Sequence, residues 1–352
     1  MVRTVLRLRG RLAALRRALA PPSAVVLEGA LALADTAAMR AVAGLGIPDR
    51  LDDGPKPAAV LAEDCGVEPA ALDRLLRFAV SRGLLATTRR GEYRNNRIAR
   101  ALRTDDPTSM RDLALFAGAP THLELWSQLE ASIRTGQSAA AVGFGKPVFE
   151  VFADQPTFGA HFNGGMEALS RVQAPAVLSA HDFSTATSVC DVGGGTGTLL
   201  AEILHAHPHL DGTLLDLEEV VADAGTVLEG YSVADRVEAV GGDFFVAVPA
   251  GADRYVLQSI IHDWDDDAAV EILRNVRAAM GPTSRLLVVE MDLPTAAADH
   301  PGETLDLEML VVTEGGRERT RAEHEALFAR ADLRIERTTG RPPHAIFELS
   351  AA

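Results

Sequence analysis

Cysteine, aromatic residues and long apolar runs are all scarce in this sequence. Only Cys65 and Cys190 occur among 352 residues, and Cys190 lies inside an apolar segment. A structural disulfide is therefore not expected, and a reducing, cytoplasmic compartment fits. The longest apolar runs fall well short of the roughly 18 residues that a transmembrane helix needs, so neither a membrane span nor a membrane partner is expected.

Positive charge is also in short supply. The chain has 34 basic and 49 acidic residues, and its net charge of −15 disfavours binding to nucleic acids and to anionic membranes. The exception is the N-terminus, where residues 1–20 contain six arginines and no acidic residue. Arg7, Arg9 and Arg11 interrupt the apolar core that a signal peptide requires. Instead of a targeting segment we expect an amphipathic helix, with these leucines partly buried against another chain or domain: Leu6, Leu8, Leu12, Leu15 and Leu19.

Motifs for metal binding and for hydrolysis are missing as well. There is no Cys-x-x-Cys and no His-Glu-x-x-His pattern, and the ten histidines are scattered along the chain, so no metal is expected. The Gly-x-Ser-x-Gly sequence that marks many hydrolases is also absent. These absences leave a glycine-rich segment in the middle of the chain as the main functional signal.

A glycine loop follows a short apolar segment that ends near Asp191. Its glycines Gly193, Gly195 and Gly197 allow a ligand to lie directly on the backbone. A dinucleotide fingerprint needs the third glycine one position later, where this chain has Thr198, and the Gly-Lys-Ser/Thr ending of a phosphate-binding loop is absent. Asp191 would repel a polyphosphate, but it suits a ligand that has an ammonium or sulfonium group. S-adenosylmethionine (SAM) carries both groups and is the expected cofactor.

Residues 183–352 alternate between short apolar strands and helical segments. This alternation predicts an α/β domain with a parallel, doubly wound, Rossmann-like sheet of seven strands that binds SAM and carries the catalytic residues. The candidate strands are 188–192, 213–216, 237–240, 254–257, 285–291, 333–338 and 345–350. Because ligands bind beyond the carboxyl ends of parallel strands, the residues just after each strand carry most of the information.

The first 104 residues predict a mainly helical domain of the winged-helix type. Two helical segments around the turn at 66–69 have helix–turn–helix spacing, with Pro69 in the first turn of the second helix, and a small β-wing follows. In a chain this acidic we expect residues 1–104 to serve in dimerisation or in covering the substrate, with DNA binding as the alternative. Residues 105–182 are expected to form a helical linker that covers the substrate, and 183–352 the catalytic domain.

Acidic residues follow the second and third candidate strands. Asp216 comes 25 residues after Asp191 and can accept hydrogen bonds from both ribose hydroxyls, although it could also be the N-cap of the next helix. Asp243 and Phe244 follow the third strand. A carboxylate there can accept an adenine amino hydrogen while the ring packs on the base. The alternatives are a loop acid and a core phenylalanine.

His262 follows the fourth strand and lies at the expected mouth of the cleft. A neutral imidazole can take a proton near pH 7, so His262 is the candidate general base. Glu290, which ends the fifth strand, and Glu318 could flank the imidazole, orient it and stabilise its charged form. The alternatives are a loop acid for Glu290 and a helix-entry ion pair for Glu318. Asp263 and the acids at 265–267 are expected to cap the helix that follows and to complement its dipole.

Four motifs together resemble the small-molecule O-methyltransferases of the plant caffeate and bacterial natural-product type. They are Asp-Val-Gly-Gly-Gly-Thr-Gly at 191–197, Gly-Asp-Phe-Phe at 242–245, His-Asp-Trp at 262–264 and Gly-Gly-Arg-Glu-Arg-Thr at 315–320. The resemblance covers nearly the whole chain and is greatest to the actinobacterial branch. It implies an N-terminal winged-helix domain that forms a homodimer and a C-terminal class I SAM-dependent domain whose product is S-adenosylhomocysteine.

The resemblance also implies roles for individual residues. Asp191, Gly193 and Gly195 would line the methionine moiety of SAM, and Ser170 would reach its carboxylate. The residues already named for the ribose, for the adenine and for the role of general base keep those roles in the family pattern. Family members hold a flat aromatic ring in the acceptor pocket, which in this chain would be lined by Phe162, Met166 and Met309.

Two positions depart from the plant relatives. Gln258 stands four residues before the histidine, where plant enzymes have lysine, so a SAM contact must differ and Ser259 is the candidate to supply it. Thr313 stands where plant enzymes often have asparagine, so the pattern of acceptor hydroxyls is not expected to be caffeate-like.

The reaction implied is transfer of the SAM methyl group to a phenolic hydroxyl of a small aromatic secondary metabolite of the polyketide type. Two alternatives remain. The same fold could use SAM as a structural cofactor for hydroxylation or decarboxylation, which the presence of His262 disfavours. A SAM-sensing winged-helix regulator that binds DNA is the other, and the acidic charge disfavours it.

Overall fold

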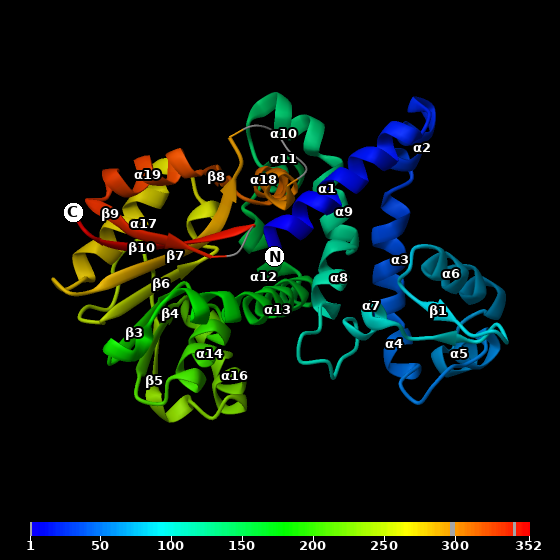
Figure 1. Ribbon diagram of the computed structural model, residues 1–352, viewed down its shortest axis with the longest axis horizontal. Coiled ribbons are helices and arrows are strands. Elements are labelled where there is room, and N and C mark those ends of the chain that lie inside the picture. The colour runs from blue at the N-terminus through cyan, green and yellow to red at the C-terminus, as the bar shows by residue number, and fades with distance from the viewer. Residues whose placement is uncertain (1, 296–299, 341–342) are drawn as a thin grey trace. The chain divides into compact units, whose positions relative to one another are not determined.

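The computed structural model describes residues 2–295, 300–340 and 343–352 (Figure 1). Its contacts divide the chain into two compact units. The larger unit holds the first ten residues with 125–151 and 170–352, and the smaller unit holds 11–124 and 152–169. Four helices run from one unit into the other: α1 (Val2–Leu19), α9 (Pro120–Ser127), α12 (Val148–Asp154) and α13 (Pro156–Ala180).

A twisted sheet forms the centre of the larger unit. Its strands follow the order β5-β4-β3-β6-β7-β10-β9, and β8 pairs with β7 beside this path. The seven strands of that path match the seven segments expected from the sequence. The bounds are β3 (Ser188–Val192), β4 (Asp211–Asp216), β5 (Val237–Gly241), β6 (Arg254–Gln258), β7 (Arg285–Leu293), β8 (Arg319–Thr320), β9 (Leu333–Thr339) and β10 (His344–Ala351).

One strand corrects the expectation of a parallel sheet. β10 runs antiparallel to both β7 and β9, whereas the neighbouring pairs from β5 to β7 are parallel. Only residues 340–343 separate β9 from β10. A parallel crossover needs a dozen or more residues, so this short connection leaves an antiparallel pairing as the available arrangement. The α/β class is confirmed, with a mixed sheet.

Apolar side chains of the strands alternate between two cores, one on each face of the sheet. Cys190 and Val288 belong to the core beneath α17 and α19, and Val189 and Leu287 belong to the core beneath α14 (Figure 1). This alternation follows from the two-residue period of a strand. The covering helices are α14 (Thr198–Ala206), α15 (Glu218–Val221), α16 (Ala224–Gly230), α17 (Asp266–Ala279) and α19 (Arg321–Arg330), and α10 (Leu129–Thr135), α11 (Ala139–Phe144) and α18 (Pro301–Val312) complete the unit.

The smaller unit contains the helix–turn–helix and the wing. Gly66 ends the first of these helices in the left-handed conformation (φ 66°), and the Glu68 carboxylate caps the second by accepting hydrogen bonds from the backbone of Ala70 and Ala71. The wing is the pair β1 (Ala86–Thr87) and β2 (Tyr93–Arg94). The helices are α2 (Pro22–Ala30), α3 (Leu33–Gly44), α4 (Ile47–Arg50), α5 (Ala58–Cys65), α6 (Pro69–Ser81), α7 (Arg97–Arg100) and α8 (Arg111–Ala117).

The N-terminal segment forms the expected helix, α1, but its leucines are not covered within this chain. Leu8, Leu12 and Leu15 are each more than half exposed, and Leu19 is 77% exposed. The side chain of Leu6 lies outside the described residues. Burial against a second chain therefore stays a prediction for these leucines. None of the described helices is long and apolar enough to cross a membrane.

Candidate active site

The glycine loop connects β3 to α14 by way of three glycines in the left-handed region. Their φ angles are 69° at Gly193, 61° at Gly195 and 82° at Gly197. Gly193 donates its backbone N–H to Leu215 O (2.8 Å), and Gly195 donates to the Asp216 Oδ2 carboxylate oxygen (2.8 Å). A Cβ at Gly195 would meet no described atom within 4 Å, so the backbone is open to a ligand there.

Asp191 is a buried carboxylate at the start of this loop. It is 2% exposed, and its Oδ2 atom has no hydrogen-bond partner among the described residues. Burial and the nearby Asp216 carboxylate raise its pKa to about 7. A buried, unpartnered carboxylate is stabilised by a cationic ligand, so the site fits the ammonium or sulfonium group of SAM.

Asp216 ends β4 next to the loop. Its Oδ1 accepts a hydrogen bond from the backbone of Leu217. Burial raises the pKa of the Asp216 carboxyl group, and the hydrogen bonds from the backbone of Gly195 and Leu217 act to lower it. The capping position of α15 is Leu217, so the alternative of Asp216 as N-cap is wrong. The carboxylate keeps lone pairs for ribose hydroxyls, and this role stays a prediction.

Asp243 and Phe244 follow β5 at the same edge of the sheet. Asp243 is exposed, and its Oδ1 accepts a hydrogen bond from the backbone of Phe245. The Phe244 ring borders the glycine loop, because a Cβ at Gly193 would lie 3.4 Å from ring atom Cε1. Phe244 also packs on the core, so the two interpretations of this ring are compatible.

His262 lies at the centre of three carboxylates. It sits in a short 3₁₀ turn, η3 (Ile261–Asp263), after β6. Its Nδ1 atom is 2.7 Å from Glu318 Oε1 and 3.7 Å from Glu290 Oε2, and its Nε2 atom is 3.6 Å from Asp263 Oδ1. Glu290 is 1% exposed and Glu318 3% exposed. The structure therefore brings together the three residues that the sequence assigned to catalysis, and the helix-entry ion pair is wrong for Glu318.

Backbone groups hold the two glutamates in place. Glu290 Oε1 accepts hydrogen bonds from the N–H groups of Ile260 (3.1 Å) and Ile261 (3.0 Å), and the backbone of Glu318 donates to Asp306 Oδ1 (2.8 Å). Within the described part of the chain, neither Glu290 Oε2 nor Glu318 Oε2 has a hydrogen-bond partner. Both free oxygens belong to residues that flank the imidazole, so the cluster has excess negative charge available to a cation.

The charges decide the protonation state of His262. Burial by itself lowers the pKa of the imidazole, but Glu290, Asp263 and Glu318 more than compensate and raise it to about 10. Burial in turn raises the pKa of Glu290 to about 7. Because Nδ1 is held by Glu318, Nε2 is the nitrogen left for proton exchange with another molecule. The cluster stabilises an imidazolium and can store a proton.

Asp263 and the acids at 265–267 were expected to cap the following helix, and this expectation is wrong for Asp263 but confirmed for Asp265. The N-cap of α17 is Asp265, whose carboxylate accepts hydrogen bonds from the backbone of Asp267 and Ala268. The 3₁₀ turn places Asp263 beside the imidazole instead. Its position directly after the histidine was a signal that could have revealed this role.

A chain of amides near this cluster was missed. Gln258 Nε2 donates to Gln173 Oε1 (2.6 Å), and Gln173 Nε2 lies 3.1 Å from His344 Nε2. His344 pairs with Met291, next to Glu290, across β10 and β7. Burial lowers the pKa of His344. Gln258 at the departure from the plant pattern is thus held by a neighbour on α13, which no local sequence signal indicates.

The other assigned residues are distributed between the units. Ser259 follows β6 with φ 54°, and its backbone N–H donates to Val289 O, while Ser170 lies on α13 in the larger unit. Met309 and Thr313 are buried, and the Thr313 hydroxyl donates to Met309 O (2.8 Å). The remaining two assigned residues, both on α13 in the smaller unit, are Phe162, whose ring stacks on Phe152, and Met166. Their roles stay predictions.

Metal binding is a further geometric possibility for the histidine cluster. His262, Glu290 and Glu318 each offer a ligand atom, and these atoms lie within 4.8 Å of one another. No Cys-x-x-Cys or His-Glu-x-x-His motif accompanies them in the sequence. A site without metal therefore stays our prediction.

Comparison with known protein families covers most of the chain. The O-methyltransferase domain family matches residues 126–334, and the O-methyltransferase dimerisation domain family matches residues 27–105. Mitomycin biosynthesis 6-O-methyltransferase of Streptomyces lavendulae is 38% identical over 88% of this chain and 88% of its own length. Phenazine O-methyltransferase PhzM of Lysobacter antibioticus is 38% identical over 90% of this chain and 92% of its own. Aclacinomycin 10-hydroxylase RdmB of Streptomyces purpurascens is 34% identical over 90% and 86%.

Solved structures agree with these relatives. The crystal structure of LaPhzM has a TM-score of 0.89 and 36% identity, and covers 95% of this chain and 100% of its own. The O-methyltransferase NcsB1 from neocarzinostatin biosynthesis, solved in complex with SAM and 2-hydroxy-5-methyl naphthoic acid, has a TM-score of 0.75 and 34% identity over 91% and 96% of the two chains. The chain belongs to the O-methyltransferase family with an N-terminal dimerisation domain, and it is a SAM-dependent O-methyltransferase.

Proposed function

We propose that this enzyme methylates a phenolic hydroxyl of an aromatic natural product, with His262 as the general base. The observation that carries this proposal is the 2.7 Å contact between His262 Nδ1 and Glu318 Oε1, inside a cluster of three carboxylates of which Glu290 and Glu318 are buried. The resemblance to natural-product O-methyltransferases of Streptomyces supports the acceptor class. NcsB1 with its bound hydroxynaphthoic acid supports a fused aromatic ring.

The residues at the carboxyl edge of the sheet fit the methyl donor. When bound, SAM supplies an electrophilic methyl group. Asp191 offers a buried carboxylate to a cationic group, Asp216 offers lone pairs to hydroxyls, and Phe244 offers a ring face beside the loop. Ser170 and Ser259 are the candidates for the donor's carboxylate. Together these groups would orient the donor.

His262 takes the proton in the proposed step. The phenolic O–H bond breaks, its proton moves to Nε2, and the oxygen's electron pair would form the new O–C bond. The S–C bond of the donor would break in the same step, its electron pair would stay on sulfur, and S-adenosylhomocysteine would leave. Glu318 holds Nδ1 and, with Glu290 and Asp263, stabilises the imidazolium that results. In the free protein the raised pKa means that the imidazole must first lose a proton. A cation bound beside it makes that loss easier, because like charges repel.

Positioning accounts for much of the expected rate. Holding the oxygen in line with the methyl group supplies an entropic advantage, and general-base catalysis adds roughly 10²–10⁴-fold. Phe162, Met166 and Met309 are the residues that we expect to hold the flat ring.

Dimerisation through the N-terminal domain is part of the proposal. The family of the matched segment is named for dimerisation, and the leucines of α1 are exposed in the single chain. A second protomer would bury them. Sedimentation of the wild type beside a Leu12→Glu variant tests this: we expect a dimer and a shift toward monomer, and a monomeric wild type would contradict it.

One relative favours a second candidate function. RdmB, a hydroxylase, shares 34% identity with this chain, so the fold also supports hydroxylation. The two reactions differ in the mass of their products. Incubating the enzyme with SAM and 2-hydroxy-5-methyl naphthoic acid, and with the matching methyl ether as control, separates them by mass spectrometry. A methyl ether that His262→Ala fails to form supports the proposal, and an oxygenated product supports the second candidate.

Cofactor binding is tested first. We expect calorimetric titration to show SAM binding and no NAD binding by the wild type. Absence of SAM binding would overturn the cofactor assignment independently of any acceptor.

A further inference from the structure

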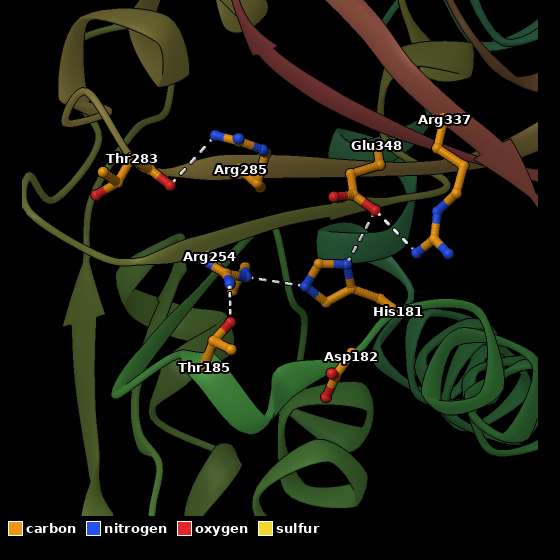
Figure 2. A pocket seen from close by; sticks show the side chains of 8 residues that line it. All are labelled: His181, Asp182, Thr185, Arg254, Thr283, Arg285, Arg337 and Glu348. Atoms are coloured by element: carbon orange, nitrogen blue, oxygen red, sulfur yellow. Dashed lines mark hydrogen bonds and ion pairs between the residues drawn. The ribbon is translucent and has the colours of Figure 1, made fainter.

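A second polar pocket lies at the opposite edge of the same sheet, where β6 and β7 begin. It has a volume of about 260 Å³ (Figure 2). Arg254 is the first residue of β6 and Arg285 the first residue of β7, so both guanidinium groups come from the amino ends of strands. β6 ends at Gln258, on the side of the glycine loop and His262. The pocket is therefore distinct from the candidate active site.

Arg254 is a buried cation without a carboxylate partner. It is 9% exposed, and its Nε donates to His181 Nε2 (2.8 Å) and its Nη2 to Thr185 Oγ1 (2.9 Å). The remaining bond goes from Nη1 to the backbone oxygen of Asp253. In the described chain, no carboxylate oxygen lies within ion-pair distance of this guanidinium. Burial lowers the pKa of Arg254, as expected for a cation that lacks a full counter-charge.

Arg285 is the second cation without an ion pair. Its Nη1 donates to the backbone oxygens of Thr283 and Ser284, and the described residues place no carboxylate within 4.0 Å of it. The charge of Arg285 acts to lower the pKa of Arg254, whereas Asp253, Glu348 and Asp182 act to raise it, so the two guanidinium groups repel each other beside carboxylates that offset part of that repulsion. Two like charges close together are stabilised when an anion binds between them.

The carboxylates that line the pocket are already engaged. Glu348 Oε2 lies 3.2 Å from His181 Nδ1 and accepts a hydrogen bond from Arg337 (3.0 Å) (Figure 2). The Asp182 carboxylate accepts a hydrogen bond from the backbone of Ser184. His181 accepts from Arg254 at Nε2, and burial lowers its pKa, so it is neutral at pH 7. Because His181 is neutral, the guanidinium groups of Arg254, Arg285 and Arg337 face two carboxylates, Glu348 and Asp182, and the lining of the pocket has a net positive charge.

We propose that this pocket binds a small oxyanion of the phosphate class between Arg254 and Arg285. The planar guanidinium fork matches the oxygens of a phosphate and forms charge-assisted hydrogen bonds with it. The volume is below the roughly 300–1,000 Å³ of pockets that enclose drug-sized ligands. The occupant is therefore free phosphate or the phosphate end of a monoester that projects into solvent.

Isothermal titration with inorganic phosphate tests the site. At constant ionic strength, with chloride as the background anion, we expect one saturable site on the wild type. Arg285→Gln removes one charged donor and should weaken binding at least about tenfold. Arg334→Gln is the matched control, because Arg334 is an exposed arginine on β9 that pairs with Glu336 outside the pocket. Its affinity should equal that of the wild type.

Three results would overturn the proposal. They are no saturable binding by the wild type, equal binding by wild type and Arg285→Gln, and equal losses in Arg285→Gln and Arg334→Gln. If the variant fails to fold, phosphorus NMR of inorganic phosphate with the wild type alone gives a second test. We expect the phosphate line to broaden when the protein is added, and an unchanged line width would overturn the proposal. Competition with glucose 6-phosphate identifies the source: equal or tighter binding indicates a monoester, and failure to compete indicates free phosphate.

Discussion

Two largely buried histidines at opposite edges of one sheet differ in the charge that surrounds them. His262 and His181 each have a glutamate on Nδ1, at 2.7 Å from Glu318 and 3.2 Å from Glu348. On the other nitrogen, His262 faces the carboxylate of Asp263, whereas His181 accepts a hydrogen bond from the Arg254 guanidinium. The pKa of the first is raised and that of the second lowered. Burial lowers the pKa of both imidazoles, but three carboxylates act on His262 and only one acts on His181, so the number of nearby carboxylates decides the direction of the shift.

This difference gives His262 a role in proton transfer and His181 a role in holding the structure. The imidazole of His262 can exist in both protonation states within a cluster that stabilises the charged one. The imidazole of His181 is fixed as a neutral acceptor for Arg254. Substitutions at the two positions should therefore have opposite consequences for activity and for stability.

His262→Ala should give the largest effect on activity. Removing the proton acceptor should lower kcat for a phenolic acceptor by about 10²–10⁴-fold while SAM still binds. The measurements are steady-state kinetics and calorimetric titration with SAM. His205→Ala, at an exposed histidine on α14, is the control and should keep full activity. An His262→Ala variant with wild-type turnover would remove His262 from the role of base.

Asp216→Ala should weaken SAM binding by at least about tenfold. The carboxylate accepts the backbone N–H of Gly195, so its removal costs both the proposed ribose contact and the anchor of the loop. Asp211→Ala changes an exposed carboxylate on the same strand and should leave the dissociation constant unchanged. Equal affinities for the two variants would argue against Asp216 as a cofactor ligand.

His181→Ala should act on stability instead. The change leaves Arg254 Nε without its acceptor in a buried position, which costs about 1–3 kcal/mol of unfolding free energy. Urea unfolding measures this loss, and kcat should stay near the wild-type value where the variant is folded. A large fall in kcat without a loss of unfolding free energy would contradict the structural role of His181.

The sequence was most informative about residues that follow parallel strands, because the sheet brings these residues together although they are far apart in the chain. Seven strands could be read from apolar segments, and parallel strands deliver their carboxyl ends to one edge. Asp191, Asp216 and His262 could therefore be grouped although they are far apart in the chain. The Glu318 carboxylate lies well beyond these strands. It was proposed as an acid that could flank the imidazole, and the resemblance of its motif supported that role.

What the sequence did not reveal depends on pairing between distant segments. The direction of β10 follows from a short connection, and it sets His344 beside Met291 and so near Glu290. Asp263 looked like a helix cap because acids cluster there, but the 3₁₀ turn at η3 directs it to the imidazole. No local pattern predicts the direction of β10, and the local signal for Asp263 was its position directly after the histidine.

Glu318→Gln should give the smallest change, a shift in the pH profile. Glu318 raises the pKa of His262, so replacing the carboxylate with an amide lowers that pKa. The acidic limb of log(kcat/KM) against pH reports loss of the His262 proton, so it should move to lower pH by roughly one unit. The plateau should fall, because a less basic imidazole is a weaker proton acceptor. Glu325→Gln, at an exposed position of α19, should leave the profile in place. A limb that moves to higher pH would mean that Glu318 does not act on His262 through its charge.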